Sequence, residues 1–91
     1  MRNKEIKERF VNESTEDKQK RELYLGVFQD CVKFEDEKNK DISMFTFNEF
    51  ANMMENLKSK YSRSMYASFN IGTVIILLKE YVKYVSDNQI S

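Results

Sequence analysis

The stretch FTFNEF, residues 45–50, contains the clearest helix-start signal in the chain. Thr46 stands at the N-cap position and Glu49 follows three residues later, which is the capping-box pattern. The phenylalanines at the two ends of the stretch occupy the positions of a hydrophobic staple. The pattern predicts a helix that begins at Phe47 and ends near Lys58. The buried face of this helix should consist of Phe47, Phe50, Ala51, Met54 and Leu57.

Apolar residues at helical spacing extend this pattern in both directions along the chain. Upstream, residues 1–13 predict a short helix or arm, and Ser14 is the expected N-cap of a longer helix that ends near Asn39. Downstream, Ser62 is the expected N-cap of a last helix that ends near Asp87. The last helix should bury Ala67, Ile71, Val74, Leu78, Tyr81 and Val85, with a second apolar face in its N-terminal half at Met65, Phe69, Gly72 and Ile76. These elements predict an all-α fold, a small orthogonal bundle of about four helices.

The composition favours helices around a single small core. The chain has 91 residues, of which 41% are apolar, with no proline and two glycines. This bias disfavours a sheet with many tight turns. Gly26 lies inside the first long helix, where it costs about 1 kcal/mol relative to alanine, so a neighbouring helix is expected to cross closely there. Met53, Met54 and Met65 are interpreted as adaptable core residues.

Several kinds of site are excluded by residues that the chain lacks. It contains no histidine and a single cysteine, Cys31, which removes Cys/His zinc sites, histidine-activated nucleophiles and an intramolecular disulfide. Cys31 is interpreted as a small core residue in a reducing compartment. The longest apolar run, residues 71–78, is too short to span a membrane, and residues 1–10 lack the apolar core of a signal peptide. We therefore expect a cytoplasmic, non-enzymatic protein without a cofactor or metal.

One basic segment is evident although the net charge of the chain is zero. Residues 12–57 carry a net charge of −5, whereas residues 58–91 carry +3. No acid occurs between Glu55 and Glu80. The segment KSKYSRSMYASFN, residues 58–70, leads into the last predicted helix, whose first N–H groups would suit a phosphate together with the hydroxyls and cations of the segment. The alternative interpretation is an ordinary helix cap in a polar loop, with solvated lysines.

Three stretches together carry a resemblance to a known family. STEDKQKRELYLGVFQDCVKFEDEKNKDI, residues 14–42, is similar to the first long helix of that family. MFTFNEFANMMENLKSK, residues 44–60, is similar to its middle helix, and YSRSMYASFNIGTVIILLKEYVKYVSDN, residues 61–88, to its last helix. The aromatic core positions of the first long helix are occupied by Tyr24, Phe28 and Phe34. In this order the stretches resemble the N-terminal core-binding domain of phage integrases and other tyrosine recombinases, a SAM-like helical bundle also present in recombinase-like lytic-cycle repressors of phages.

The resemblance implies one half of a clamp around duplex DNA, whose other half is a separate C-terminal catalytic domain. The chain would then consist of a short helix or arm at residues 1–13 and a core-binding domain at residues 14–91, non-catalytic by itself. Its implied partners are duplex DNA, a C-terminal recombinase-like domain and further copies of itself on DNA. The implied DNA-contacting residues are Lys58, Lys60, Ser62, Arg63, Ser64 and Tyr66, with Lys18 and Arg21 as a second set. Such domains are often basic, so the isoelectric point of about 6.3 predicts weak binding by the isolated chain.

The competing interpretation is a helical protein-interaction or oligomerisation module of a phage regulatory protein. Its signature would be an exposed apolar patch, around Ile6 and Phe10 or around Tyr81 and Tyr84. An enzyme is a distant third interpretation, because no converging set of acids and bases can be named. A titration with duplex DNA at low salt discriminates the first two interpretations.

Overall fold

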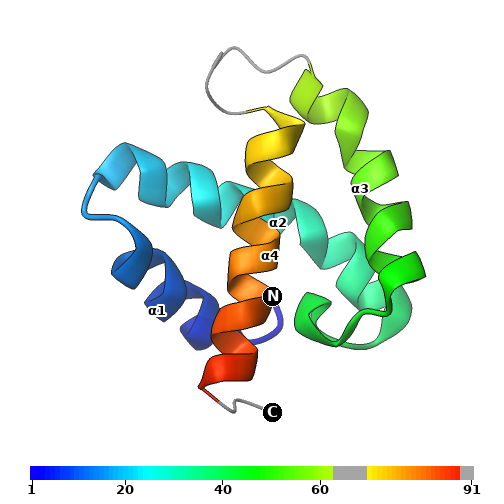
Figure 1. Cartoon of the computed structure of the whole chain (residues 1–91), viewed down its shortest axis with the longest axis horizontal. Coiled ribbons are helices and arrows are strands. Elements are labelled where there is room, and N and C mark those ends of the chain that lie inside the picture. The colour runs from blue at the N-terminus through cyan, green and yellow to red at the C-terminus, as the bar shows by residue number, and fades with distance from the viewer. Residues whose placement is uncertain (63–69, 89–91) are drawn as a thin grey trace. The chain divides into compact units, whose positions relative to one another are not determined.

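The computed structural model of the chain describes residues 1–62 and 70–88. These residues form four α-helices and one short 3-10 helix, and none of them lies in a strand (Figure 1). The elements are α1 (Lys4–Ser14), α2 (Lys18–Lys38), η1 (Ile42–Met44), α3 (Phe47–Ser62) and α4 (Ile71–Asp87). The predicted all-α fold with four helices, the first of them short, is therefore confirmed.

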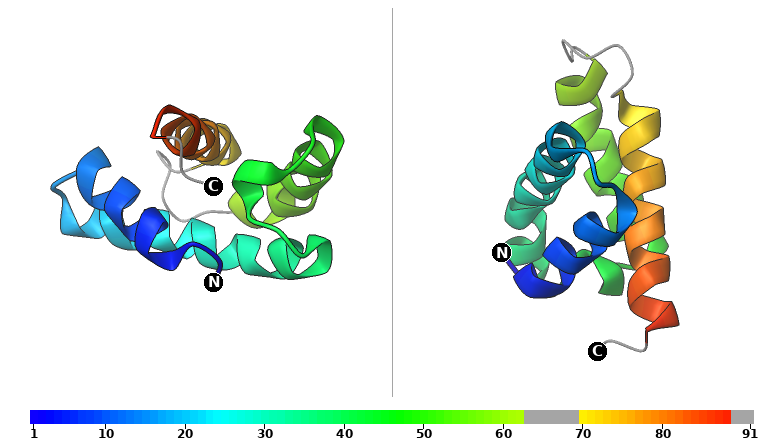
Figure 2. Two further views of the ribbon diagram at one scale, coloured as in Figure 1. Left: turned by 90° about the horizontal axis from the view of Figure 1, so that it is seen from below. Right: turned by 90° about the vertical axis from the view of Figure 1, so that its left-hand side faces the viewer.

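The chain divides into two units, Met1–Ile42 and Ser43–Ser91. The first unit contains α1 and α2, and the second contains α3 and α4. Within the first unit, the chain turns back after the last residue of α1, so that α2 packs against α1 (Figure 2). Within the second unit, α3 packs against α4. The division into an N-terminal segment of residues 1–13 and a domain of residues 14–91 stays a prediction.

The N-terminus of α2 lies at Lys18 because Asp17 caps it. The Asp17 carboxylate accepts a hydrogen bond of 2.9 Å from the backbone N–H of Gln19. The predicted cap was wrong, since Ser14 is the last residue of α1 and its hydroxyl donates to the carbonyl of Phe10 at 2.7 Å. Serine and aspartate are both good caps, so the residue types alone do not distinguish the two positions.

The middle of α2 is open to solvent at its glycine. Gly26 is exposed, and a Cβ atom built there would meet no atom within 4 Å. The predicted close crossing of a neighbouring helix at this glycine is therefore wrong. The predicted end of the helix is confirmed, because α2 stops at Lys38 and Asn39 follows in the left-handed conformation with φ of 56°, as is common for a helix C-terminus.

The core of the first unit is built around an aromatic pair. The rings of Phe10 and Phe28 meet edge to face, with centroids 6.1 Å apart and planes inclined at 73°, a favourable geometry for two aromatic quadrupoles. Val11, Val27 and Cys31 are also buried. Burial raises the pKa of the Cys31 thiol to about 12. The interpretation of this cysteine as a core residue is confirmed.

The predicted capping box at the start of α3 is formed. The hydroxyl oxygen of Thr46 accepts from the backbone N–H of Glu49 at 3.2 Å, and the Glu49 carboxylate accepts from the backbone N–H of Thr46 at 2.9 Å. The helix begins at Phe47, as predicted, but continues past Lys58 to Ser62. Residues 58–62 contain no glycine or proline, so nothing in the chain breaks the helix at its predicted end.

The buried face of α3 is shifted from the predicted one. Met53, Leu57 and Tyr61 recur at intervals of four residues and are buried together with Met54, so the interpretation of Met53 and Met54 as core residues is confirmed. Phe47 was expected in the core but is 86% exposed. Ala51 is exposed as well, and Phe50 is half-buried. Residues of the first turn therefore lie at the edge of the face that the rest of the helix buries.

The last helix begins later than predicted. Asn70 is the N-cap of α4, and its side-chain oxygen accepts from the backbone N–H of Thr73 at 3.2 Å. Ser62 therefore does not cap this helix. Its C-terminus at Asp87 agrees with the prediction.

The buried face of α4 follows the predicted spacing. The buried residues are Val74, Leu77, Leu78, Tyr81 and Val85. Ile71 is half-buried, whereas Gly72 and Ile76 are exposed, so the predicted second apolar face is wrong at these two positions. The expected positions at Met65, Ala67 and Phe69 lie outside the described residues.

Candidate nucleic-acid interface

Two exposed lysines lie in the last turns of α3. Lys58 and Lys60 are both exposed, and the ammonium of Lys60 lies 6.0 Å from the ring centroid of Tyr61. Tyr61 itself is buried, with 8% of its surface exposed. The Lys60 ammonium therefore lies at the limit of cation–π distance from an aromatic core residue while the lysine side chain stays exposed.

The electrostatic surroundings of the predicted basic segment differ from those expected, because its first residues lie at the end of a helix and not at the start of one. Lys58, Lys60 and Ser62 were expected at the start of the last helix but belong to the C-terminal end of α3. Unpaired carbonyl groups gather at a helix C-terminus, and the helix dipole is negative there. A phosphate at this end would therefore contact side-chain cations and not backbone N–H groups. Three further predicted positions, Arg63, Ser64 and Tyr66, lie outside the described residues.

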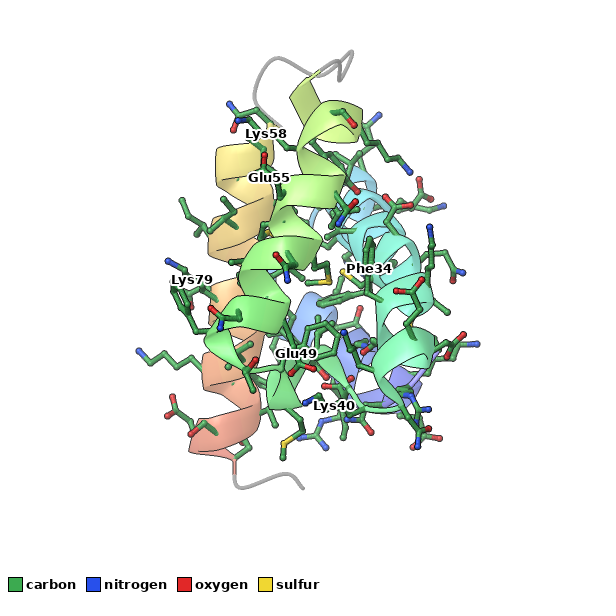
Figure 3. All side chains as sticks on the ribbon, turned by 90° about the vertical axis from the view of Figure 1, so that its right-hand side faces the viewer. Phe34, Lys40, Glu49, Glu55, Lys58 and Lys79 are labelled. Carbon is green, nitrogen blue, oxygen red and sulfur yellow. The ribbon has the colours of Figure 1, made fainter. Side chains whose placement is uncertain are left out.

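One acid lies close to these lysines in the sequence. Glu55 is exposed and precedes Lys58 by three residues, a spacing at which helical side chains are neighbours. Figure 3 shows both residues near the C-terminal end of α3. The positive potential at this end of the helix is therefore reduced on the Glu55 side.

The second predicted set lies at the start of α2. Lys18 is exposed and Arg21 is half-buried. The Arg21 guanidinium donates to the carbonyl oxygen of Glu16 at 2.6 Å. Because the Asp17 carboxylate already accepts from the first N–H groups of α2, this helix N-terminus does not present a free anion site. Any phosphate contact here would again depend on side chains.

The first unit contains a buried ionic cluster that was not predicted from the sequence. The Lys7 ammonium lies 2.7 Å from Glu35 Oε2 and 3.0 Å from Asp41 Oδ1. It also donates to the carbonyl oxygen of Arg2 at 2.8 Å. The backbone N–H of Ile42 donates to Glu35 Oε2 at 3.0 Å. The cluster joins α1 to α2 and to the residues that follow α2, and its solvent exposure is 0% at Lys7 and Glu35 and 6% at Asp41.

Burial changes the protonation of this cluster. The pKa of Glu35 rises to about 7, first because of burial and then because of a hydrogen bond with Asp41, while Lys7 opposes the rise. A signal for this cluster exists in the sequence, since Glu35 continues the four-residue spacing of Val27 and Cys31. A glutamate on the apolar face of a helix indicates a buried partner of opposite charge.

The exposed apolar surface differs from both predicted patches. Phe10 and Tyr81 are buried, with 5% and 0% of their surface exposed. Neither can therefore form the exposed patch that was expected around it. Among the described residues of the second unit, the large exposed apolar residues are instead Met44, Phe47 and Ile76, at 63%, 86% and 64%.

The part of the chain that the structure describes offers no candidate metal site. Among residues 1–62 and 70–88, no group of three or more His, Cys, Asp and Glu side chains is arranged to hold a metal ion. The raised pKa of the buried Cys31 keeps that thiol protonated at neutral pH. Within the same residues, no helix is both long enough and apolar enough to cross a membrane.

The helices define the class of this chain as a small all-α domain. It carries exposed lysines on α3 and a buried ionic cluster in the first unit. The family model described as MrpR, N-terminal core-binding domain, matches residues 1–87. The chain belongs to this family, which confirms the core-binding domain that the resemblance predicted. No curated protein and no solved structure matches the chain.

Proposed function

We propose that this core-binding domain binds duplex DNA, mainly through phosphates, and is non-catalytic by itself. The observation that carries the proposal is the pair of exposed lysines, Lys58 and Lys60, at the end of α3. They begin a stretch of sequence that contains no acid before Glu80. Membership of a core-binding domain family supports DNA as the partner.

The proposed surface has a principal and a subsidiary set of residues. The principal set is Lys58, Lys60, Ser62, Arg63, Ser64 and Tyr66, and the subsidiary set is Lys18 and Arg21. Lysine and arginine would neutralise phosphates, and the hydroxyls would donate hydrogen bonds to phosphate oxygens. Because the whole chain has no net charge, we expect a dissociation constant in the non-specific range of about 10⁻⁴–10⁻⁶ M or weaker.

We further propose that this weak binding takes place within a longer protein in the cytoplasm of a bacterial host. A C-terminal recombinase-like domain, tethered to this one, would raise the local concentration of DNA at the surface. Further copies of this chain, bound at neighbouring DNA sites, would also raise the local concentration of DNA at the surface. Individually weak phosphate contacts are sufficient under these conditions.

The test compares two charge-matched double variants by fluorescence anisotropy with a labelled duplex. We expect the Lys58→Glu/Lys60→Glu variant to lose affinity at low salt and to lower the slope of log K against log salt by about one for each lysine. The control is Lys79→Glu/Lys83→Glu, which makes the same change of charge at two exposed lysines of α4. The control should keep most of its affinity.

Amide shifts of the isotope-labelled chain locate the contact. Shifts induced by DNA should gather at residues 58–62 and weaken as salt is added, since phosphate contacts release counterions. Equal affinities of the two double variants would refute the surface. A spectrum unchanged by DNA at about 50 mM salt would refute DNA binding by this chain altogether.

A further inference from the structure

An open apolar groove lies in the second unit between the start of α3 and the middle of α4. Its volume is about 240 Å³, and its lining is predominantly apolar. The lining residues are Phe45, Thr46, Phe47, Phe50, Lys79 and Val82. None of the lysines proposed to contact DNA lines this groove.

The capping box holds the exposed rim of the groove in place. Thr46 and Glu49 exchange two hydrogen bonds around the first turn of α3, and Phe47 is the first residue of that turn. With 86% of its surface exposed, Phe47 contributes little to the core. A large aromatic side chain that is exposed to water beside an apolar groove is typical of an interaction site.

The size of the groove matches one large apolar side chain. A dry engineered cavity of about 150 Å³ in another protein holds a benzene molecule. The groove measures about 240 Å³ and is open on one side. It therefore has room for the ring of a phenylalanine or for a leucine side chain, whose backbone would remain outside.

The edge of the groove on α4 is positively charged. Lys79 lines it and is exposed, and Lys83 is exposed one turn further along the helix. Glu80 and Val82 are two residues apart, or about 200° around a helix, so Glu80 points away from the flank that Val82 lines. The Glu49 carboxylate on the opposite side is already bonded to the backbone N–H of Thr46. Figure 3 shows Lys79 beside the N-terminal half of α3, whereas Lys58 lies near the other end of that helix.

We propose that this groove binds an acidic amphipathic helix of a protein partner. One apolar side chain of that helix enters between Phe47, Phe50 and Val82. A carboxylate one turn away on the same face pairs with the ammonium of Lys79. Charge complementarity at Lys79 and Lys83 selects an acidic helix over a basic one, and a groove between two helices suits the helix-in-groove mode of recognition.

The test uses two synthetic helical peptides that differ only in charge. Both carry a phenylalanine on the apolar face, flanked one turn away by glutamates in the first peptide and by lysines in the second. We expect the acidic peptide to bind at least about tenfold more tightly than the basic one. Its amide shifts on the labelled chain should gather at residues 45–50 and 79–83.

Two variants with matched controls assign the contacts. Lys79→Glu should weaken the acidic peptide and strengthen the basic one, whereas Lys58→Glu, the same charge change outside the groove, should leave both affinities unaltered. Phe47→Ala should lower the affinity about tenfold or more. Met44→Ala, which truncates another exposed apolar side chain outside the lining, should not.

Three outcomes would overturn the proposal. The first is that neither peptide binds, and the second is that Lys79→Glu leaves the preference between them unchanged. The third is that the groove signals shift on dilution of the chain alone, which would identify a second copy as the occupant. These outcomes are separate from the DNA test, because that test depends on Lys58 and Lys60 and leaves Lys79 as its control.

Discussion

Lys7 shows how much a single residue can depend on its surroundings. By residue type it belongs on the surface, yet its side chain is fully buried between Glu35 and Asp41. Removing a charge from water is costly unless the charge is paired and hydrogen-bonded. The Lys7 ammonium meets this condition through two carboxylates and the Arg2 carbonyl. With both acids ionised, however, the three side chains carry a net negative charge.

Replacement of Lys7 by methionine should destabilise the chain strongly. The Lys7→Met variant keeps the apolar stem but leaves Glu35 and Asp41 buried without their cation. Removing one member of a buried ion pair typically costs about 3–5 kcal/mol. The measurement is the free energy of unfolding in urea. Lys4→Met, an exposed position on the same helix, is the control and should stay within about 0.5 kcal/mol of the parent.

The stability of the chain should depend on pH through Glu35. Its pKa rises from 4.5 in the unfolded chain to about 7 in the folded chain. Between these two pH values, the folded state holds a proton that the unfolded state has released. A carboxyl shifted in this direction stabilises most below pH 4.5 and loses that contribution as the pH rises to about 7. Ionisation of Glu35 adds a second buried negative charge to the Lys7–Asp41 pair. We expect a loss on the order of 1–3 kcal/mol over this range.

The Glu35→Gln variant isolates this contribution from other titrating groups. Glutamine can still accept from the backbone N–H of Ile42, and Lys7 can still pair with Asp41, but no ionisation follows. Unfolding in urea at pH 5 and pH 8 should therefore show a smaller loss in this variant than in the parent chain. Glu37→Gln, at an exposed position, should retain the parental dependence. An identical loss in Glu35→Gln and the parent would contradict the assignment.

At the scale of the secondary-structure element, α3 begins as its sequence predicts. Thr46→Ala removes the hydroxyl that accepts from the Glu49 N–H and should cost about 0.5–2 kcal/mol of stability. The midpoint of urea unfolding measures this loss. Thr46→Ser keeps the hydroxyl and should restore most of the stability. If the alanine and serine variants unfold at the same midpoint, the cap does not stabilise the helix.

The other end of α3 changes the chemistry expected of the basic segment. The helix continues to Ser62, and α4 starts only at Ile71 under the cap of Asn70. Lys58 and Lys60 therefore lie at a negative helix end, where cations offset the unpaired carbonyls. The proposed phosphate contact would use these two ammonium groups, because the carbonyl groups at this end of α3 cannot donate hydrogen bonds. This difference makes the charge-reversal test more decisive, because binding would depend on the lysine side chains.

At the scale of the whole molecule, two surfaces of the second unit should act independently. The proposed DNA contact uses the C-terminal end of α3, and the proposed protein contact uses its N-terminal end together with Lys79 of α4. A chain with no net charge binds through local groups of charges and not through its overall field. Each charge-reversal variant can therefore serve as the control for the other.

Much of the helical architecture was predictable because helices depend on short-range interactions. The capping box of residues 46–49 joins groups only three residues apart, and it identified the start of α3 correctly. Where two good caps lay close together, as at Ser14 and Asp17, residue type was insufficient to choose between them. The end of α3 was missed because its hydroxyl-rich residues are compatible with both a cap and a helix.

Burial followed less closely from the sequence because it depends on contacts between distant residues. The alternating four- and three-residue spacing of α4 correctly predicted Val74, Leu78, Tyr81 and Val85 as buried. The sequence did not reveal that Lys7 would meet Glu35, 28 residues away, or that Phe47 would remain in water. Periodicity determines which residues share a helix face, whereas the packing of other elements determines which face is covered. The helices and their caps thus follow from local sequence, while the buried ionic cluster and the open apolar groove arise from tertiary packing.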